Sequence, residues 1–483
     1  MSNIDVETVV DKALEQAEAE LRDALVDLGR DALQGDLSFR ELEHQFAGTL
    51  LTFARSMLAA MLSLYDRDEP YLEHEGTIWR HTETVSKTYR SIWGPLEVER
   101  SVYRKRGESA GPQLVPLELQ AGLIEGEWTP HCAEAIARMV QSVPTREACR
   151  NMEVVGILPD SRSGFDRVVE ALGETWEANR CDLEEEVIEA VEVPEEAEGI
   201  SVAYDRACIQ MDETTRAPEE WPNGRRQPRE IEGRMAYCGT VTLHDSEGEP
   251  LWTKRYGRPA RASEAFDGPG AGEWIVREQL KWDVEALVER APRLSDQAAA
   301  LCDGGPELER MLEEDFPDWT QLCDLRHLSS YLSAALDEAS EAGEIEDPEQ
   351  QRRVWIEQLK QEDGAIEEIE QTLHAWEARE GGDIEAARTY IENRRDRLLN
   401  YSSAHQKGLP IASGHVEATC KSLIEMRMRR SGARWTPDAA ERMLTFRSLA
   451  LSKTWATGMS ALLERFEDDS FERCDELCDR AAA

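Results

Sequence analysis

Three carboxylates at the ends of predicted elements have the residue type and placement of a site for divalent cations. The run ISVAYDRACI (200–209) alternates in the manner of a strand and reaches Asp205. A second apolar run, in QAAALCDGGPELERML (297–312), reaches Asp303, and Glu417 lies where a later helix is predicted to begin. Oxygen ligands on rigid elements suit a pair of Mg²⁺ ions in phosphoryl displacement. Metal-dependent phosphoryl transfer is therefore the first hypothesis for this chain.

The helix that would carry Glu417 is followed by a basic run. Cys420 and Leu423 recur at helical spacing and predict a buried stripe, whereas Lys421 shares a face with Glu417. A carboxylate beside basic side chains at a helix N-terminus suits a metal ion together with a phosphate backbone. The alternative is a surface helix with a solvated basic face, which these residues taken alone favour. Core packing is the favoured role for Trp435 at the end of the run. The basic residues are Arg427, Arg429, Arg430 and Arg434.

Several sequence blocks between about residue 200 and residue 455 together have the pattern of a known family. They are SVAYDRACIQM, RMAYCGTVTLHDSEG, RYGRP, ALCDGGPELERML, CDLRHLSSYL, LPIASGHVEATCKSLIEMRMRRSGARW and FRSLALSKTW. On these blocks the chain resembles the insertion-sequence transposases of the ISKra group, which are relatives of the Mutator-type DDE enzymes. The block that contains Glu417 is the longest of these and the most specific.

The resemblance implies a transposase that binds terminal inverted repeats and catalyses Mg²⁺-dependent DNA strand cleavage and strand transfer. It implies that Asp205, Asp303 and Glu417 are both the metal ligands and the catalytic residues, with two Mg²⁺ or Mn²⁺ ions as cofactors. Arg206 stands where many members of the family have glycine. Asp212 is an acidic alternative to Asp205, but it lies outside the resemblance.

The CDLRHL block adds Asp324 and His327 as supporting residues. The resemblance places Asp324 near the end of a strand and His327 at the start of the next helix. There they could position the scissile phosphate or the leaving group. An ordinary hydrogen-bonded histidine is the alternative for His327. Lys421 is a third supporting residue.

The predicted order of elements from residue 200 is that of an RNase H-like fold. We predict strands 200–205, 235–243 and 251–257, helix 273–290, strand 297–303, helix 306–314 and strand 319–325. Pro306 opens the helix that follows Asp303. The expected fold class is α/β: an RNase H-like mixed sheet with helices on both faces. An all-helical insertion interrupts this sheet, and a mainly helical N-terminal DNA-binding region precedes it.

Changes of pattern along the chain divide it into seven parts. The N-terminal helical region is 1–75, the β-hairpin is 76–110, and a helical region resembling a helix-turn-helix is 111–195. The core occupies 196–328 and 409–460 around the helical insertion 329–408. The acidic tail 461–483 is expected to fray beyond about residue 466. In the first part, an apolar stripe predicts either a packed helical hairpin or a dimer surface; its residues are Phe46, Leu50, Phe53, Met57 and Met61.

Two segments outside the carboxylate blocks could meet DNA. In the region 111–195, a turn at Ile157–Ser161 would join the helices of a helix-turn-helix, with a plain helical bundle as an equal alternative. Its arginines are Arg146, Arg150, Arg162 and Arg167. The polar, proline-containing loop 214–233 carries Arg225 and Arg226 and is expected to be a mobile DNA-contacting loop, with simple disorder as its alternative.

The charge of the chain conflicts with DNA binding at low salt. Asp and Glu number 98 against 55 Lys and Arg, which gives a formal net charge of −43. Phosphate neutralisation by basic side chains supplies much of the affinity of DNA-binding proteins. Either the chain does not bind DNA, or it works at high ionic strength, where screening shortens the range of repulsion to a few ångströms. We favour the second reading and a halophilic source.

The remaining features bear on compartment and partners. The ten cysteines include no CxxC pair, which favours reduced, intracellular thiols over disulfides or a zinc site. We expect no signal peptide and no apolar run long enough to span a bilayer. The expected location is the cytoplasm, at the nucleoid during action. The expected partners are double-stranded DNA, as transposon ends and target, and further copies of the chain in a homodimer or higher oligomer. No membrane partner is expected.

Two other classes of function remain open. The chain could be a non-catalytic or domesticated DNA-binding relative of such a transposase, or an inactive copy. The set of three carboxylates argues against inactivation, but not against a new use. An acidic helical scaffold with no nucleic-acid role is the third possibility, which the charge taken alone would suggest.

Overall fold

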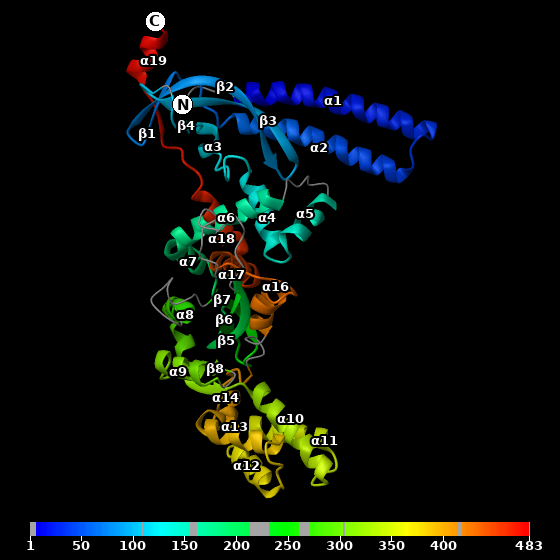
Figure 1. The fold of residues 1–483 in the computed structure, drawn as a ribbon, viewed down its shortest axis with the longest axis vertical. Coiled ribbons are helices and arrows are strands. Elements are labelled where there is room, and N and C mark those ends of the chain that lie inside the picture. The colour runs from blue at the N-terminus through cyan, green and yellow to red at the C-terminus, as the bar shows by residue number, and fades with distance from the viewer. Residues whose placement is uncertain are drawn as a thin grey trace, which may run out of the picture. The chain divides into compact units, whose positions relative to one another are not determined.

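The computed structural model describes residues 6–108, 110–154, 162–212, 231–259, 271–302, 305–412 and 418–482. The chain forms two compact units: Met1–Leu183 with Thr457–Ala483, and Glu184–Ala456 (Figure 1). Each unit contains one five-stranded sheet together with helices. The expected mixed α/β class with a helical N-terminal region is therefore confirmed at this level.

The first unit begins with a long helical hairpin of α1 (Val6–Gln34) and α2 (Phe39–Ser63). Ser38 and Glu41 form a capping box at the start of α2, in which the Ser38 N–H donates to Glu41 Oε2 at 2.8 Å. The apolar stripe of α2 is poorly covered, because Phe46 is 44% and Leu50 is 42% exposed. This exposure favours a surface for association over a fully packed hairpin.

Helix α2 also corrects one expectation from the sequence. By length and composition, α2 could cross a membrane. An 18-residue stretch of it has a mean hydropathy of 1.3, and only 6% of that stretch is buried. The expectation that no apolar run reaches that length is therefore wrong. Helices of proteins outside membranes meet the same criterion, so a membrane span is not established.

The sheet of the first unit has the strand order β10-β1-β2-β3-β4. Its strands are β1 (Tyr71–His74), β2 (Thr77–Ser91), β3 (Gly94–Lys105), β4 (Gln113–Leu114) and β10 (Phe471–Arg473). The long hairpin of β2 and β3 lies where the sequence predicted one. The expectation that the C-terminal tail frays is wrong, because β10 pairs with β1 and is followed by α19 (Asp475–Ala482). Phe471 is buried and stacks on His74, which is 2.7 Å from Asp468.

Five helices lie between the first sheet and the second unit's strands in the sequence. They are α3 (Pro116–Gln120), α4 (Pro130–Val140), α5 (Thr145–Val154), α6 (Arg162–Ala178) and α7 (Arg180–Glu189). Helices α4, α5 and α6 pack against one another. The predicted turn Ile157–Ser161 lies outside the described residues, so the helix-turn-helix stays a prediction.

The sheet of the second unit has the strand order β7-β6-β5-β8-β9. Strands β5 (Gly199–Asp212), β6 (Ile231–His244) and β7 (Pro250–Pro259) are antiparallel neighbours. Strands β8 (Ala298–Cys302) and β9 (Thr320–Cys323) continue the sheet parallel to β5. Helix α8 (Ala271–Arg290) and the 3₁₀ turn Pro292–Asp296 precede β8, and α9 (Pro306–Asp315) precedes β9. This order of elements agrees with the predicted one.

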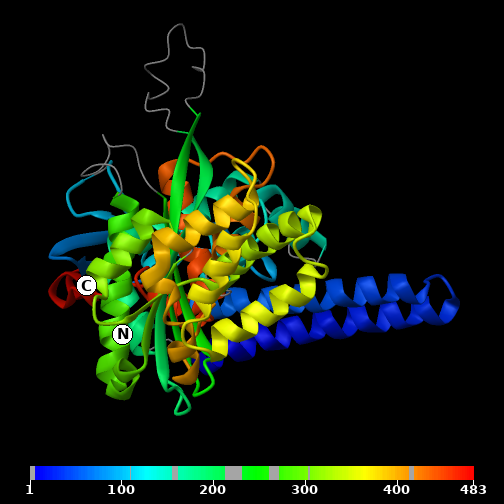
Figure 2. The same ribbon diagram turned by 90° about the horizontal axis from the view of Figure 1, so that it is seen from below.

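Helices cover both faces of this sheet (Figure 2). Alternate residues along a strand point to opposite faces. Val202 and Tyr204 of β5 belong to a core with residues of α8 and α9, whereas Ala203 belongs to a second core with helices that follow β9. Gly239 of β6 allows close approach of α8, because a Cβ atom there would meet Leu280 at 3.0 Å.

The helices after β9 are α10 (Leu325–Ala342), α11 (Pro348–Gln361), α12 (Ala365–Ala375), α13 (Asp383–Leu398) and α14 (Tyr401–Gln406). They form one apolar core with Ala299 and Leu301 of β8 and Leu322 of β9. The chain then passes through a π-helical turn, η4 (Cys420–Glu425), and α16 (Met426–Met428). It ends this unit with α17 (Pro437–Leu451) and the start of α18 (Trp455–Glu464).

Candidate functional site

Three parallel strands reach the same level of the second unit's sheet. Tyr204 of β5 pairs with Cys302 of β8, and Cys302 pairs with Cys323 of β9. Strands β8 and β9 end at this level, whereas β5 continues to Asp212, so Asp205 lies within β5 and not at the predicted strand end. Ligands of open α/β sheets bind beyond the carboxyl ends of parallel strands, which here are those of β8 and β9. Asp303 lies outside the described residues, but the strand that leads to it has the predicted place beside β5. The residues that follow the three strand positions in the sequence are Asp205, Asp303 and Asp324.

Asp205 is half-buried and lies opposite Cys238 of β6. Its Oδ1 atom accepts the N–H of Arg206 at 2.6 Å. Ligand atoms of Asp205, Cys238 and Cys420 all lie within 4.8 Å of one another. The helical turn that follows Glu417 in the sequence is therefore held beside Asp205, although residues 413–417, Glu417 among them, lie outside the described residues.

Two arginines fix this helical turn on the sheet. Arg447 of α17 is buried and donates its Nε–H to the main-chain oxygen of Leu423 at 2.7 Å, with a second bond to Ser422. Arg255 of β7 donates to Thr419 Oγ1 at 3.1 Å. Burial lowers the pKa of Arg447 to about 10. A π-helix leaves its carbonyls out of the usual α-helical register, so these donors stabilise a form that is frequent at functional sites.

Asp324 is fully buried and caps α10. Its side chain accepts the N–H of Arg326 at 2.8 Å, and its own N–H donates to the main-chain oxygen of Cys302 at 2.9 Å. Asp324 thereby joins the end of β9 to the residue before Asp303. His327 is half-buried in the first turn of α10. The placement of both residues agrees with the predicted strand end and helix start.

The basic residues after Glu417 divide into two groups. Lys421, Arg429, Arg430 and Arg434 are exposed, and Arg429 forms an ion pair with Glu425. Arg427 is only 6% exposed, and its guanidinium lies over the ring of Trp435 at 4.7 Å. This placement gives Arg427 a packing role in place of a direct DNA contact.

Trp435 packs the end of the basic run against β5, as the favoured expectation had it. Its indole N–H donates to the main-chain oxygen of Met428 at 3.1 Å. Its main-chain N–H donates to the main-chain oxygen of Gln210. The Asp212 N–H donates to the Trp435 oxygen at 2.7 Å. Asp212 is seven residues along the strand from Asp205, or about 23 Å, so the two cannot share an ion. Arg225 and Arg226 lie outside the described residues.

A second group of possible ligands lies on β8, β9 and α9. Ligand atoms of Cys302, Cys323 and Glu309 are within 4.8 Å of one another. Cationic side chains already occupy this group: Arg397 Nη1 is 3.7 Å from Cys302 Sγ, and Arg394 Nε is 3.0 Å from Glu309 Oε1. Guanidinium groups repel a metal ion, so this cluster is the poorer cation site.

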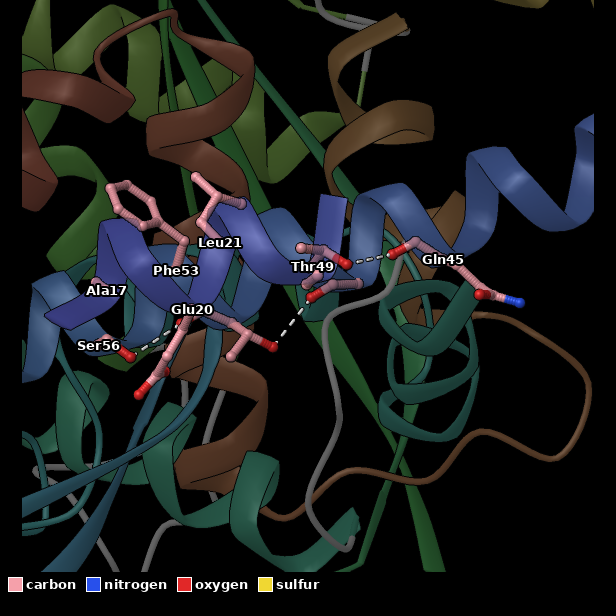
Figure 3. A pocket seen from close by; sticks show the side chains of 10 residues that line it. Ala17, Glu20, Leu21, Gln45, Thr49, Phe53 and Ser56 are labelled. Carbon is pink, nitrogen blue, oxygen red and sulfur yellow. Dashed lines mark hydrogen bonds between the residues drawn. The ribbon is translucent and has the colours of Figure 1, made fainter. Parts of the chain in front are cut away.

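A groove of about 310 Å³ between α1 and α2 lies apart from this chemistry (Figure 3). Ala17, Leu21 and Phe53 line it together with hydroxyl groups of α2. These hydroxyls are bonded within the helix: Thr49 donates to the Gln45 oxygen at 3.0 Å, and Ser56 donates to that of Thr52 at 3.3 Å. The groove is therefore a seam of the hairpin and no catalytic pocket.

No protein-family model matches the chain, and no curated protein matches it. The sequence analysis gave no role to Cys238, although it lies in the block RMAYCGTVTLHDSEG, and it interpreted Cys420 as a packing residue. It also missed Arg255 and Arg447 as supports of the helical turn. The blocks RYGRP and FRSLALS, where an arginine stands among apolar and small residues, held the signal for both.

Proposed function

We propose that the chain is a DDE transposase of an insertion sequence, with an RNase H-like core in its second unit. It would bind terminal inverted repeats and catalyse metal-dependent DNA strand cleavage and strand transfer. The strand order β7-β6-β5-β8-β9, with three antiparallel strands followed by two parallel ones, supports this proposal. Helices on both faces of the sheet support it as well.

One observation carries the proposal. Cys420, three residues after Glu417, has its ligand atom within 4.8 Å of the Asp205 carboxylate. The residue before Asp303 pairs with the residue before Asp205. Segments that are far apart in the sequence and that each carry or lead to one predicted carboxylate thus lie close together beside the middle of β5. A plain acidic scaffold gives no reason for this convergence.

Asp205 supplies an oxygen ligand of the kind that a hard divalent cation takes: its carboxylate is half-buried, and one of its oxygens lies within 4.8 Å of the sulfurs of Cys238 and Cys420. Asp205, Asp303 and Glu417 would hold two Mg²⁺ or Mn²⁺ ions. Ions bound there would activate a water molecule or a DNA 3′-hydroxyl as the nucleophile, and they would stabilise the 3′-oxygen that leaves.

The chain's own residues position the site and the DNA. Arg206 is tied to Glu307 at the start of α9, which holds the segment after Asp303 near β5. Asp324 bonds the main chain before Asp303. Lys421, on η4, and the exposed arginines Arg429, Arg430 and Arg434, which follow α16, would contact phosphates. With a net charge of −43, such local contacts need high salt to screen the rest of the molecule.

Association of two copies is part of the proposed function. The hairpin of α1 and α2 leaves large apolar side chains exposed on both helices, and a second hairpin could cover them in a four-helix arrangement. An anionic lipid surface is the poorer occupant, because α1 carries more Asp and Glu than Lys and Arg.

The test is cleavage of a labelled transposon end in molar salt with Mg²⁺. Asp205→Asn, Asp303→Asn and Glu417→Gln should each lower the cleavage rate by roughly a thousandfold or more, because each removes several kcal/mol of transition-state stabilisation. All three variants should still bind the labelled end. Asp212→Asn is the matched control on the same strand and should cleave at the parental rate.

The outcomes separate the three classes of function. Cleavage that depends on the three carboxylates supports the transposase. Specific binding of the end without metal-dependent cleavage indicates a non-catalytic or domesticated relative. If the chain neither binds nor cleaves the end at any salt concentration, the acidic scaffold is the class of function that remains. Cleavage retained by Asp205→Asn would remove the proposed site.

A further inference from the structure

Two thiols lie beside the Asp205 carboxylate. Asp205 comes from β5, Cys238 from β6, and Cys420 is the first residue of η4. Their ligand atoms all lie within 4.8 Å of one another. In a tetrahedral site with Zn–S bonds of about 2.3 Å, two sulfur ligands are roughly 3.8 Å apart. The three groups therefore need to close by about 1 Å or less to share one ion.

The positions of the three ligands are fixed by the fold. Asp205 and Cys238 are directly opposite each other in the β5–β6 ladder. The turn that carries Cys420 is held by Arg447 through Leu423 and by Arg255 through Thr419. Cys238 is fully buried and Cys420 nearly so, whereas Asp205 is half-buried. Water is thus excluded from the two sulfurs but can reach the carboxylate.

We propose that Asp205, Cys238 and Cys420 form a site for one thiophilic divalent cation, with Zn²⁺ as the representative ion. Each thiol loses its proton on binding, so one cation replaces two protons and the two sulfurs become thiolate ligands. Asp205 supplies the third ligand, and the fourth position is left for water, as in zinc sites with three protein ligands. Hard ions such as Mg²⁺ do not favour sulfur, so this site differs in chemistry from the proposed catalytic pair.

Sharing of Asp205 gives the site a consequence for activity. A thiophilic ion bound there would withdraw the carboxylate from the catalytic ions, so Zn²⁺ would inhibit strand cleavage and a chelator would restore it. This consequence rests on the proposed function. The binding of the ion does not, and it is tested separately.

Cobalt is the probe, because Co²⁺ bound by thiolates gives charge-transfer absorption in the near ultraviolet. The full chain, freed of metal and kept reduced, should develop this absorption with one equivalent of Co²⁺ and lose it when Zn²⁺ is added. Affinity should rise by about a hundredfold per pH unit while both thiols remain protonated in the free protein, since two protons leave. Asp205→Asn should weaken the affinity but keep the absorption.

Substitutions identify the sulfurs that bind. Cys238→Ala and Cys420→Ala should each reduce the charge-transfer absorption by about half or more, and the double variant should abolish it. Cys323→Ala is the matched control, since it removes one buried thiol from the other cysteine cluster. Absence of the absorption in the parent chain overturns the proposal. So does absorption that survives the double variant but disappears in Cys323→Ala.

A measurement on the unaltered chain covers the case in which a buried substitution unfolds it. Zn²⁺ should slow alkylation of Cys238 and Cys420, as identified by peptide mass spectrometry, by at least tenfold. The exposed Cys181 and Cys208 should react at the same rate with and without Zn²⁺. Equal alkylation of Cys238 and Cys420 in both conditions contradicts the site. Zn²⁺ binding without any Mg²⁺-dependent cleavage would keep this site and refute the proposed function.

Discussion

Arg447 donates its Nε–H to the main-chain oxygen of Leu423 at 2.7 Å, and this bond joins α17 to the π-helical turn beside Asp205. The arginine is buried, and it also bonds the oxygen of Ser422. A buried guanidinium is costly unless its donors are used. Here the donors satisfy carbonyls that a π-helix does not pair in the α-helical manner. The turn that carries Cys420 therefore depends on a residue of α17.

Replacement of Arg447 should loosen this turn. In Arg447→Met the oxygens of Leu423 and Ser422 lose their donor, which should cost about 1–3 kcal/mol for each one left unpaired. We expect a lower midpoint in urea unfolding of the full chain and faster hydrogen exchange in residues 420–428. Arg429→Met is the control, because Arg429 is exposed and pairs with Glu425 one turn away. An equal effect of both substitutions would show that Arg447 has no special structural role.

Two substitutions of Asp324 should distinguish its role as a helix cap from a role in the reaction. Asp324→Ala removes the acceptor for the Arg326 N–H and should cost about 1–2 kcal/mol of stability, whereas asparagine caps a helix as well as aspartate does. Asp324→Asn should therefore keep the stability of the parent chain. Urea unfolding and the strand-cleavage assay are measured on both variants.

The matched control for Asp324 is another capping aspartate of the same unit. Asp347 accepts the N–H of Gln350 at 2.9 Å at the start of α11, away from the strand ends. Asp347→Ala should lose about 1 kcal/mol of stability and keep full cleavage. If Asp324→Asn is stable but cleaves slowly, the carboxylate acts on the reaction. If it cleaves normally, Asp324 is a cap alone.

The elements of the second unit could be predicted because their apolar patterns are local. Ile200, Val202 and Tyr204 alternate along β5, and Pro306 stands at the first position of α9. The opposition of Asp205 and Cys238 could not be predicted in the same way. It depends on the register of β5 against β6, and a shift of one residue would turn Cys238 to the other face.

Two other features were missed because long-range packing decides them. A charged residue such as Arg447 is most often exposed, so nothing in the local pattern around it predicts its burial. The C-terminal segment is acidic and short of apolar residues, which favours fraying, yet β10 pairs with β1 across almost the whole chain length. Asp324 was predicted correctly at a strand end and before a helix, a placement that the resemblance of the CDLRHL block implied.

Asp283 should make the stability of the second unit depend on pH. It is buried on α8, its Oδ2 atom has no hydrogen-bond partner, and burial raises its pKa well above the usual value. The folded chain then holds a proton that the unfolded chain releases above about pH 4. Stability contributed by this group is therefore present below that pH and is lost as pH rises toward the folded-state pKa.

Neutral substitutions at residue 283 should remove this dependence. The stability of Asp283→Asn relative to the parent should increase by about 1.4 kcal/mol per pH unit between pH 5 and the folded-state pKa, as measured by urea unfolding. Asp283→Leu should show the same trend from a different starting value, because it changes packing as well as charge. A constant difference across pH 5–8 for both variants would mean that Asp283 ionises normally. The buried Lys254, whose Nζ atom is 3.3 Å from Glu184 Oε2, would then be its partner in the fold.

The hairpin of α1 and α2 should hold two copies of the chain together. Phe46 and Leu50 lie one turn apart on the exposed stripe of α2, and α1 has its own exposed apolar residues, among them Val26. Burial of such side chains contributes about 1.5–3 kcal/mol for each one fully covered. The variant Phe46→Glu with Leu50→Glu places four charges in a symmetric interface. We expect the parent chain to be a dimer and this variant to be a monomer in sedimentation experiments at molar salt.

The control for the hairpin changes exposed polar residues of the same helix. His44→Glu with Arg40→Gln lowers the net charge by as much at exposed polar positions outside the groove between α1 and α2, so the dimer should persist. Because the apolar stripe could instead meet a bilayer, the parent chain is also floated with phosphatidylcholine vesicles. A monomeric parent that floats with the vesicles would assign the stripe to a membrane. A dimer that survives Phe46→Glu with Leu50→Glu would place the interface elsewhere, since two buried glutamates from each copy cannot be desolvated without a large cost.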